Sequence, residues 1–268
     1  MYFNVGKNKY WVEIFGCGDP VVLLHGFTGS THTWYSIRDQ LAEKNQVILL
    51  DLPGHGKTQA RVTSIETCCN ELADIFKQMN LTTIHLLGYS MGGRTALTFA
   101  ILYPGFVESL ILESATPGIN DEFEKMKRIK SDQKLAQFLL ENTLEDFINK
   151  WEKIPLFHTQ QTLPESVKLK IRKERFSHSK EGLANSLQVM GTGVMPSWWE
   201  SLKQLRCKVC IIVGEKDKKF VQIGQHMNQI LMNNDFYVIK NSGHAIHVEQ
   251  EEIFGTIVNE FISRRRNN

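Results

Sequence analysis

The sequence predicts an α/β domain with a mostly parallel sheet that is covered by helices on both faces. Short apolar stretches rich in β-branched residues alternate with longer amphipathic stretches along most of the 268 residues. Alternation of this kind is typical of parallel sheets, in which each strand returns through a helix. The length suits one large domain that carries an insertion.

The predicted elements follow one another in a regular order. Residues 2–15 read as a β-hairpin that turns around Gly6-Lys7-Asn8-Lys9. Strands are then predicted at residues 20–24, 46–50, 83–89, 107–113, 208–214 and 235–240. Helices that separate most of them are predicted at residues 33–44, 64–80, 91–103, 221–232 and 249–264. The basic residues Arg264 to Arg266 are expected to form a solvated helix end whose cations suit the helix dipole.

The alternation stops between residues 118 and 200. This segment is charged and helical in pattern, and few β-branched runs occur in it. We interpret it as a helical lid, inserted into a core made of residues 1–117 and 201–268. Lids in enzymes shape the substrate pocket and exclude water from it.

Charge and hydropathy limit the classes of partner. The chain has 31 basic and 29 acidic residues, a net charge of +2, which does not support binding to nucleic acid. The first residues lack an apolar signal segment, and the longest apolar runs are far shorter than a membrane span. We therefore expect a cytoplasmic protein without a membrane span, either a monomer or a weak homo-oligomer.

Five cysteines are present, an odd number that argues against a disulfide framework. Cys207 and Cys210 have the C-x-x-C spacing, but they lie at the start of a predicted strand. Residues three apart on a strand point to opposite faces, and no second pair of ligands stands nearby to complete a zinc site. We expect buried thiols, and no metal and no organic cofactor.

The most informative stretch is Gly88-Tyr89-Ser90-Met91-Gly92, which fits the G-x-S-x-G nucleophile elbow. It lies between a predicted strand and a predicted helix, as an elbow must. Small residues are needed on both sides because the backbone at the serine is strained and the helix packs closely. The pattern makes Ser90 a candidate catalytic residue at the N-terminus of a helix.

Two further residues complete a candidate triad. His244 follows the predicted strand at 235–240, and Asp217 follows the strand at 208–214. The chain order Ser, Asp, His is that of α/β-hydrolases, where the histidine takes the serine proton and the aspartate orients the imidazole. Asp235 and Glu215 are alternatives to Asp217, but the first precedes its strand and the second stands two residues earlier.

The loop after the strand at 20–24 contains His25-Gly26-Phe27. In α/β-hydrolases this loop and the residue after the nucleophile supply an oxyanion hole, so the donors would be the amides of Phe27 and Met91. His25 is expected to bind loop backbone. Asp51 and His55 are expected to form a rigid turn beside the site, without a catalytic role.

Several arginines are candidates for recognition of an anion. Arg94 lies one helical turn beyond Ser90, so helical spacing places it on the same side of the helix. A guanidinium there could bind a carboxylate with two hydrogen bonds. For Arg128 and Arg175 in the lid, the residue pattern by itself favours a solvated helix face over contact with a ligand, and for Trp151 it favours the interior of the lid.

Taken together, the motifs resemble those of the 2-succinyl-6-hydroxy-2,4-cyclohexadiene-1-carboxylate synthases, α/β-hydrolase-fold lyases of menaquinone biosynthesis. The resemblance runs over essentially the whole chain. It is carried by Gly88-Tyr89-Ser90-Met91-Gly92-Gly93-Arg94, Trp151-x-x-x-Pro155-Leu156-Phe157, Arg175 and Gly191-Thr192-Gly193-x-x-Pro196-Ser197-Trp198-Trp199. The core motifs are common in the superfamily, whereas the arginine after the elbow and the lid motifs are more specific.

The resemblance implies a triad that abstracts a proton and expels pyruvate from a cyclohexene that bears a succinyl chain and an enolpyruvyl ether. It further implies a small polycarboxylate substrate bound by Arg94, Arg128 and Arg175, with Tyr89 and Trp151 lining the pocket. Lys127 or Lys130 could take the place of Arg128.

Two other functions remain open from the residues. The same triad serves esterases, thioesterases and C–C hydrolases, because a fold does not determine a function. A non-catalytic receptor for a small ligand is the third possibility, although the intact set Ser90, Asp217 and His244 counts against it.

Overall fold

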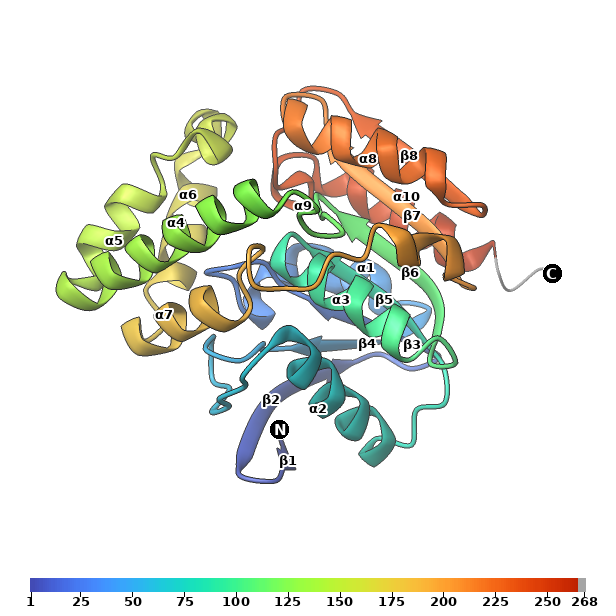
Figure 1. Cartoon of the computed structure of the whole chain (residues 1–268). Helices are drawn as coiled ribbons and strands as arrows, with labels where there is room; N and C mark the ends of the chain where they lie inside the picture. Colours follow the sequence, from blue (N-terminus) through green and yellow to red (C-terminus); the bar gives the residue numbers. More distant parts are fainter. Residues whose placement is uncertain (265–268) are drawn as a thin grey trace.

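The computed structural model describes residues 1–264, and its centre is one eight-stranded sheet (Figure 1). The strands lie in the order β1 (Tyr2–Val5), β2 (Asn8–Phe15), β4 (Asn45–Leu50), β3 (Asp19–Leu24), β5 (Ile84–Tyr89), β6 (Val107–Glu113), β7 (Lys208–Gly214) and β8 (Asn234–Ile239). The pairs β1–β2 and β2–β4 are antiparallel, and every other pair is parallel. The expected mostly parallel sheet is therefore confirmed, and so is the hairpin at its edge.

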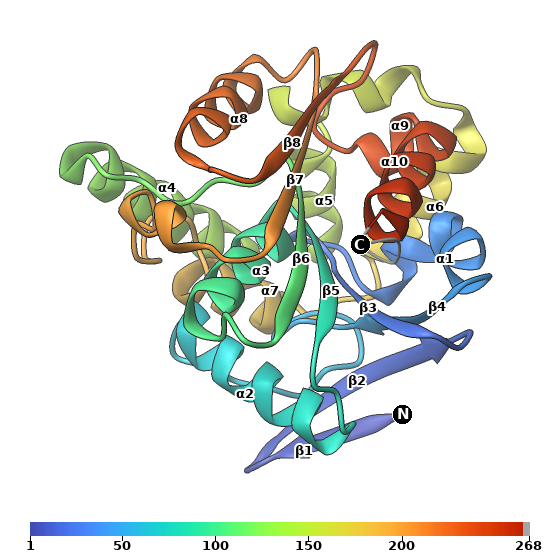
Figure 2. The same ribbon diagram turned by 90° about the vertical axis from the view of Figure 1, so that its right-hand side faces the viewer.

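Helices cover both faces of the sheet (Figure 2). One face carries α1 (Tyr35–Ala42), α9 (Ile246–Glu249) and α10 (Glu251–Ser263). The other carries α2 (Ile65–Gln78), α3 (Met91–Leu102) and α8 (Lys218–Ile230). Short 3-10 helices, η1 (Thr31–Trp34) and η3 (Glu200–Gln204), complete the two layers.

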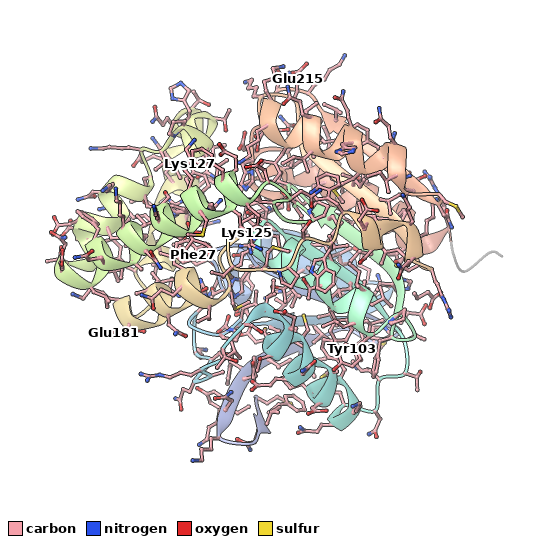
Figure 3. The ribbon with its side chains drawn as sticks, in the orientation of Figure 1. Phe27, Tyr103, Lys125, Lys127, Glu181 and Glu215 are labelled. Carbon is pink, nitrogen blue, oxygen red and sulfur yellow. The ribbon has the colours of Figure 1, made fainter. Side chains whose placement is uncertain are left out.

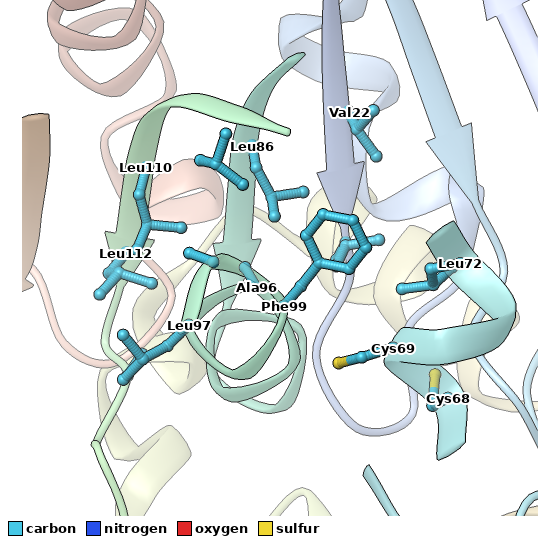
Figure 4. Packing of buried hydrophobic residues seen from close by; sticks show 14 of the residues in the cluster. Val22, Cys68, Cys69, Leu72, Leu86, Ala96, Leu97, Phe99, Leu110 and Leu112 are labelled. Atoms are coloured by element: carbon cyan, nitrogen blue, oxygen red, sulfur yellow. The ribbon is translucent and has the colours of Figure 1, made fainter. Parts of the chain in front are cut away.

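The packing of α3 against the central strands fixes the position of the elbow that precedes it. Leu86 of β5 and Leu110 of β6 face Ala96 and Phe99 of α3, and α2 lies against the outer side of α3 (Figure 4). These side chains are fully buried. The first turn of α3 is therefore held firmly at the carboxyl ends of β5 and β6.

The two cysteines of the C-x-x-C pattern belong to different layers. Cys207 packs in the core that includes α2 and α3, whereas Cys210 packs in the core that includes α1 and α10. The prediction that they point to opposite faces of the sheet is confirmed.

Two helix boundaries differ from the expectation. Helix α8 begins at Lys218 and not at 221, because the Asp217 carboxylate accepts a hydrogen bond from the Phe220 amide at 3.4 Å and caps the helix there. The predicted helix at 249–264 is α10, which begins two residues later, at Glu251, and is preceded by a short helix, α9, that was not predicted. The expected basic helix end at Arg265 and Arg266 lies outside the described residues.

Four helices stand between β6 and β7: α4 (Glu122–Glu141), α5 (Leu144–Trp151), α6 (Glu165–Arg175) and α7 (Lys180–Val189). A 3-10 segment, η2 (Pro155–Thr162), joins α5 to α6. Asp121, Thr143 and Ser179 cap three of these helices through their side chains. The group lies to one side of the sheet (Figure 1), and α4 packs along α7.

Among residues 1–264, no helix is both long and apolar enough to cross a lipid bilayer.

Replacing Gly92 by alanine should destabilise the fold, because a Cβ there would collide with the Leu24 carbonyl. We expect a loss of about 1–3 kcal/mol in the free energy of unfolding, measured with urea. Gly105→Ala is the matched control, since nothing lies within 4 Å of a Cβ at that position. Equal stability of the two variants would contradict this account.

Candidate active site

The elbow at Ser90 has the backbone geometry that the motif requires. Ser90 has a φ of 51°, in the left-handed region that non-glycine residues rarely adopt, and its amide donates to the Glu113 carbonyl at 2.8 Å. A Cβ at Gly88 would collide with the Gly92 backbone, so the turn has no room for larger residues. This close approach projects the Ser90 hydroxyl from the sheet at the start of α3.

Three side chains from three different loops meet at this point. His244 Nε2 lies 3.0 Å from Ser90 Oγ, and His244 Nδ1 lies 2.6 Å from Asp217 Oδ2. The carboxylate accepts only, so the Nδ1 atom carries the proton and Nε2 is left to accept the serine proton. The arrangement can activate the Ser90 hydroxyl as a base or as a nucleophile.

The two alternatives to Asp217 lie elsewhere. Asp235 forms an ion pair with Lys208 at 2.8 Å, and Glu215 accepts from the Asn241 amide at 3.1 Å. Both carboxylates therefore have structural partners.

A cavity of about 550 Å³ opens onto Ser90 and His244. Its volume is in the range of small-molecule sites. Phe27, Tyr89 and Met91 line it together with residues of α4, α5 and α7. Met91 begins α3, so its amide is among the first helical N–H groups, which have no acceptor within the helix. The sequence-predicted oxyanion donors are thus brought to the same cavity as Ser90.

Arg94 lies in the wall of this cavity and is almost fully buried, with 7% of its surface exposed. Its Nη1 atom donates to the Met190 carbonyl at 2.6 Å. Burial and the nearby Arg128 lower the pKa of Arg94 to about 9, so the guanidinium is still charged at neutral pH. No carboxylate ion pair to Arg94 is found among the described residues, which leaves a buried cation ready to receive an anion.

Arg128 also lines the cavity, but it has a partner of its own. Its Nε atom is 2.9 Å from both carboxylate oxygens of Asp132, four residues later on α4. Lys127 instead pairs with Glu124 at the surface, and neither Lys127 nor Lys130 lines the cavity. Figure 3 labels both Lys127, which belongs to α4, and Phe27, which belongs to the loop after β3.

Trp151 fulfils both roles that the sequence left open. Its ring packs edge-on against Phe27 and Phe157 and stacks on Phe147, and it also lines the cavity. Tyr89 lies against the His244 ring, with ring centroids 5.4 Å apart. These two aromatic side chains form apolar walls next to the reacting groups.

Among the predicted substrate-binding residues, Arg175 is the one that does not line this cavity. It is buried, forms an ion pair with Glu152 at 3.1 Å and lies over the Phe157 ring. It lines a second cavity of about 330 Å³, and Phe157 stands between the two, since it lines both. A substrate-binding role for Arg175 stays a prediction.

The sequence did not identify three lysines that line the cavity. They come from α4, α5 and the start of α8, and they are Lys134, Lys150 and Lys219. Asp132 is the single carboxylate in the lining, and Arg128 already binds it. The sequence does contain a sign that Lys219 is functional. Lys219 lies in the first turn of α8, where a cation is unfavourable because it opposes the helix dipole, and residues that break such a rule are often functional.

Neutral histidines surround the loop that carries Phe27. His25 donates from Nδ1 to the Gly26 carbonyl and accepts from the Leu52 amide at Nε2, as expected for a structural role. Burial lowers the pKa of His25 to about 3 and that of His178 to about 4. Asp51 accepts from the Thr31 and Lys57 amides, which fits the rigid turn that the sequence predicted.

Comparisons with known proteins agree with this architecture. The family model for the alpha/beta hydrolase fold matches residues 19–251. The class of the protein is therefore the α/β-hydrolase fold. The esterase from Thermogutta terrifontis has the same fold, with a TM-score of 0.84 and 26% identity over 96% of this chain and 94% of that chain.

Closer relatives define the family within this class. A provisionally named 2-succinyl-6-hydroxy-2,4-cyclohexadiene-1-carboxylate synthase of Bacillus subtilis is 43% identical over 91% of this chain and 90% of its own length. The enzyme of that name from Enterobacter sp. (strain 638) is 30% identical over 85% of this chain and 86% of its own. MenH from S. aureus matches with a TM-score of 0.92 and 35% identity, over 95% and 98%. The chain belongs to the 2-succinyl-6-hydroxy-2,4-cyclohexadiene-1-carboxylate synthase family.

Removing the charge of Arg94 should weaken the binding of anions in the cavity. We expect Arg94→Met, which keeps the buried volume, to lower the affinity for a small dicarboxylate about tenfold or more. Isothermal titration calorimetry measures this affinity. Lys127→Met is the matched control, because that cation lies on α4 outside the cavity lining. Unchanged binding to Arg94→Met would exclude Arg94 as an anion ligand.

The histidine environment predicts a loss of stability in acid. Between pH 6.5 and about 4 the unfolded chain binds protons at His25 and His178, whereas the folded chain does not, so stability falls as the pH falls. Each imidazole should cost about 2 kcal/mol between pH 7 and pH 5. In urea unfolding at both pH values, His178→Gln should reduce this loss, whereas the exposed His226→Gln should not.

An acid-induced loss that is equal in the wild type and in His178→Gln would show that this imidazole is not the group that titrates.

Proposed function

We propose that the protein is a lyase of menaquinone biosynthesis that eliminates pyruvate from 2-succinyl-5-enolpyruvyl-6-hydroxy-3-cyclohexene-1-carboxylate. The product is 2-succinyl-6-hydroxy-2,4-cyclohexadiene-1-carboxylate. One observation carries the proposal: Ser90, hydrogen-bonded to His244, faces a cavity whose lining has five arginine and lysine residues and one carboxylate. Membership of the family that bears the name of this activity supports it.

The double bonds of substrate and product define the reaction. The substrate has one ring double bond at C3 and the product has two, at C2 and C4, so the proton leaves C2 and the oxygen leaves C5. C2 bears the succinyl carbonyl, which makes its proton acidic. The electron pair left at C2 forms the C2–C3 bond, the old double bond moves to C4–C5, and enolpyruvate departs and tautomerises to pyruvate.

In this mechanism Ser90 Oγ takes the C2 proton while its own proton passes to His244 Nε2, 3.0 Å away. The resulting imidazolium is stabilised by Asp217, 2.6 Å from Nδ1. The proton is then available for the departing enolpyruvate. The triad thus serves as a base, with no acyl-enzyme.

Negative charge develops on the succinyl carbonyl oxygen as the C2 proton leaves. We assign its stabilisation to the backbone N–H groups of Phe27 and Met91, which belong to the two segments that flank the Ser90 hydroxyl. Preorganised donors of this kind stabilise the transition state more than the ground state.

The substrate has three carboxylates, which suits a cavity of excess positive charge. Arg94 offers a buried guanidinium near the triad, and Arg128, Lys134, Lys150 and Lys219 offer cations farther out. Tyr89 and Trp151 would pack against the ring. An esterase for neutral lipids would have no use for these cations.

Residues 118–200 act in this proposal as a lid over a core of residues 1–117 and 201–268. Helices α4, α5 and α7 supply a large part of the cavity wall. The lid would exclude water, which would otherwise compete for the dienolate and for its hydrogen-bond donors.

Ser90→Ala should abolish turnover without unfolding the protein, because it removes the base and leaves the cavity intact. The assay generates the unstable substrate in situ and follows pyruvate release together with loss of the substrate absorbance. Retained activity in Ser90→Ala would reject Ser90 as the base. Pyruvate release at the spontaneous rate by the folded wild type would favour an esterase, thioesterase or C–C hydrolase, or a receptor.

Asp217→Asn should lower kcat by about 10⁴-fold, because the imidazole loses the partner that sets its tautomer. Asp235→Asn is the matched control, since that carboxylate pairs with Lys208 and does not line the cavity. Similar rates for the two variants would remove Asp217 from the triad.

A further inference from the structure

Helix α6 holds the loop that follows β3, and this loop carries Phe27. The contact is made by Glu174, whose carboxylate oxygen Oε1 accepts three hydrogen bonds from the loop. The donors are the Ser30 amide at 2.7 Å, the Ser30 hydroxyl at 2.7 Å and the Thr33 hydroxyl at 2.8 Å. Glu174 lies more than 140 residues away in the chain, so this is a long-range link between the lid and the core.

A second link lies four residues farther along the chain, just beyond the end of α6. His178 Nε2 donates to the Thr28 carbonyl at 2.9 Å, and His178 Nδ1 accepts from the Gly56 amide at 3.0 Å. The imidazole therefore uses both nitrogen atoms, one as donor and one as acceptor, and must be neutral to do so. It connects two loops of the core, those after β3 and β4, to the lid.

The loop itself has a conformation that needs outside support. Thr28 is β-branched and has a φ of 66°, a left-handed conformation that is costly for such a residue. It stands directly after Phe27, whose amide is one of the two assigned oxyanion donors. The Phe27 amide is thus held next to a strained residue, Thr28. His178 donates a hydrogen bond to the Thr28 carbonyl.

Burying the Glu174 carboxylate costs more free energy than a contact that only supports the fold would need. Burial raises the pKa of Glu174, because the carboxylate gives up water, and the hydrogen bonds from Ser30 and Thr33 offset only part of this effect. An amide or an apolar residue would cover the same surface at lower cost. A buried acceptor with three loop donors does something that an apolar contact cannot, which is to define the position of the loop backbone.

We propose that Glu174 and His178 are positioning residues that hold the loop after β3 so that the Phe27 amide points at the developing oxyanion. We call this pair the latch. The inference rests on the proposed function, since it concerns the same oxyanion hole. It means that the lid sets the geometry of the reacting site in addition to covering it.

The test compares alanine variants of the latch with conservative ones. Glu174→Ala and His178→Ala should lower kcat about tenfold or more, while KM changes little. The upper limit is the roughly 10²–10³-fold loss that follows when one oxyanion donor is removed altogether. Glu174→Gln keeps the accepting oxygen and His178→Gln keeps a donor for Thr28, so both should restore most of kcat. Lys180→Met is the matched control, because Lys180 donates to the Asn142 carbonyl within the lid.

A second readout does not depend on turnover. Hydrogen–deuterium exchange of the peptide covering residues 25–34 should be faster in the alanine variants than in the wild type and in Lys180→Met. If the wild type releases no pyruvate, the proposed function fails, and the exchange data still report whether the latch holds the loop. If the alanine variants do not fold, Thr33→Val removes one donor from the loop side and allows the same comparison.

Three results would overturn the proposal. The first is an alanine variant with the kcat of the wild type. The second is unchanged exchange in residues 25–34. The third is a loss of kcat that Lys180→Met shows as well, or a loss of kcat that is accompanied by an equally large rise in KM. Either result would mean that the latch contributes only to the stability of the lid.

Discussion

The close approach of the elbow to helix α3 is the constraint on which the site depends. No side chain fits at Gly88, because the Gly92 backbone occupies that space. No side chain fits at Gly92, because the Leu24 carbonyl lies there. Within this turn Ser90 adopts a left-handed conformation and begins a helix whose first amides are unpaired. The position of the Ser90 hydroxyl, the direction of α3 and the unpaired amide of Met91 thus follow from a single packing requirement.

Electrostatics determine what the cavity can accept. A buried guanidinium such as Arg94 is costly unless a partner compensates its charge, and among the described residues Arg94 donates to the Met190 carbonyl and the Met195 sulfur but forms no ion pair. The exposed lysines of the rim add charge of the same sign. The negative charges of a polycarboxylate would compensate the positive charge of the cavity. The activity for which the family is named, which acts on such a substrate, therefore agrees with the electrostatics of the cavity.

The helical segment has two tasks that the structure separates. Helices α4, α5 and α7 form part of the cavity wall, whereas α6 and the turn that follows it bind the loops of the core through Glu174 and His178. One part of the segment can thus contact substrate while another part stays anchored. Glu174 and His178 thus anchor this segment to the loop that carries Phe27.

The sequence by itself determined the fold class, the strands and the set Ser90, Asp217 and His244, because each of these residues follows a strand end and parallel strands end at one edge of the sheet. Only the tertiary structure decided which lid cations line the cavity. Helical spacing gives the face of a side chain but not the direction in which a helix packs, so Arg175 pairs with Glu152 while Lys134 lines the cavity. The latch, too, joins residues that no local pattern connects.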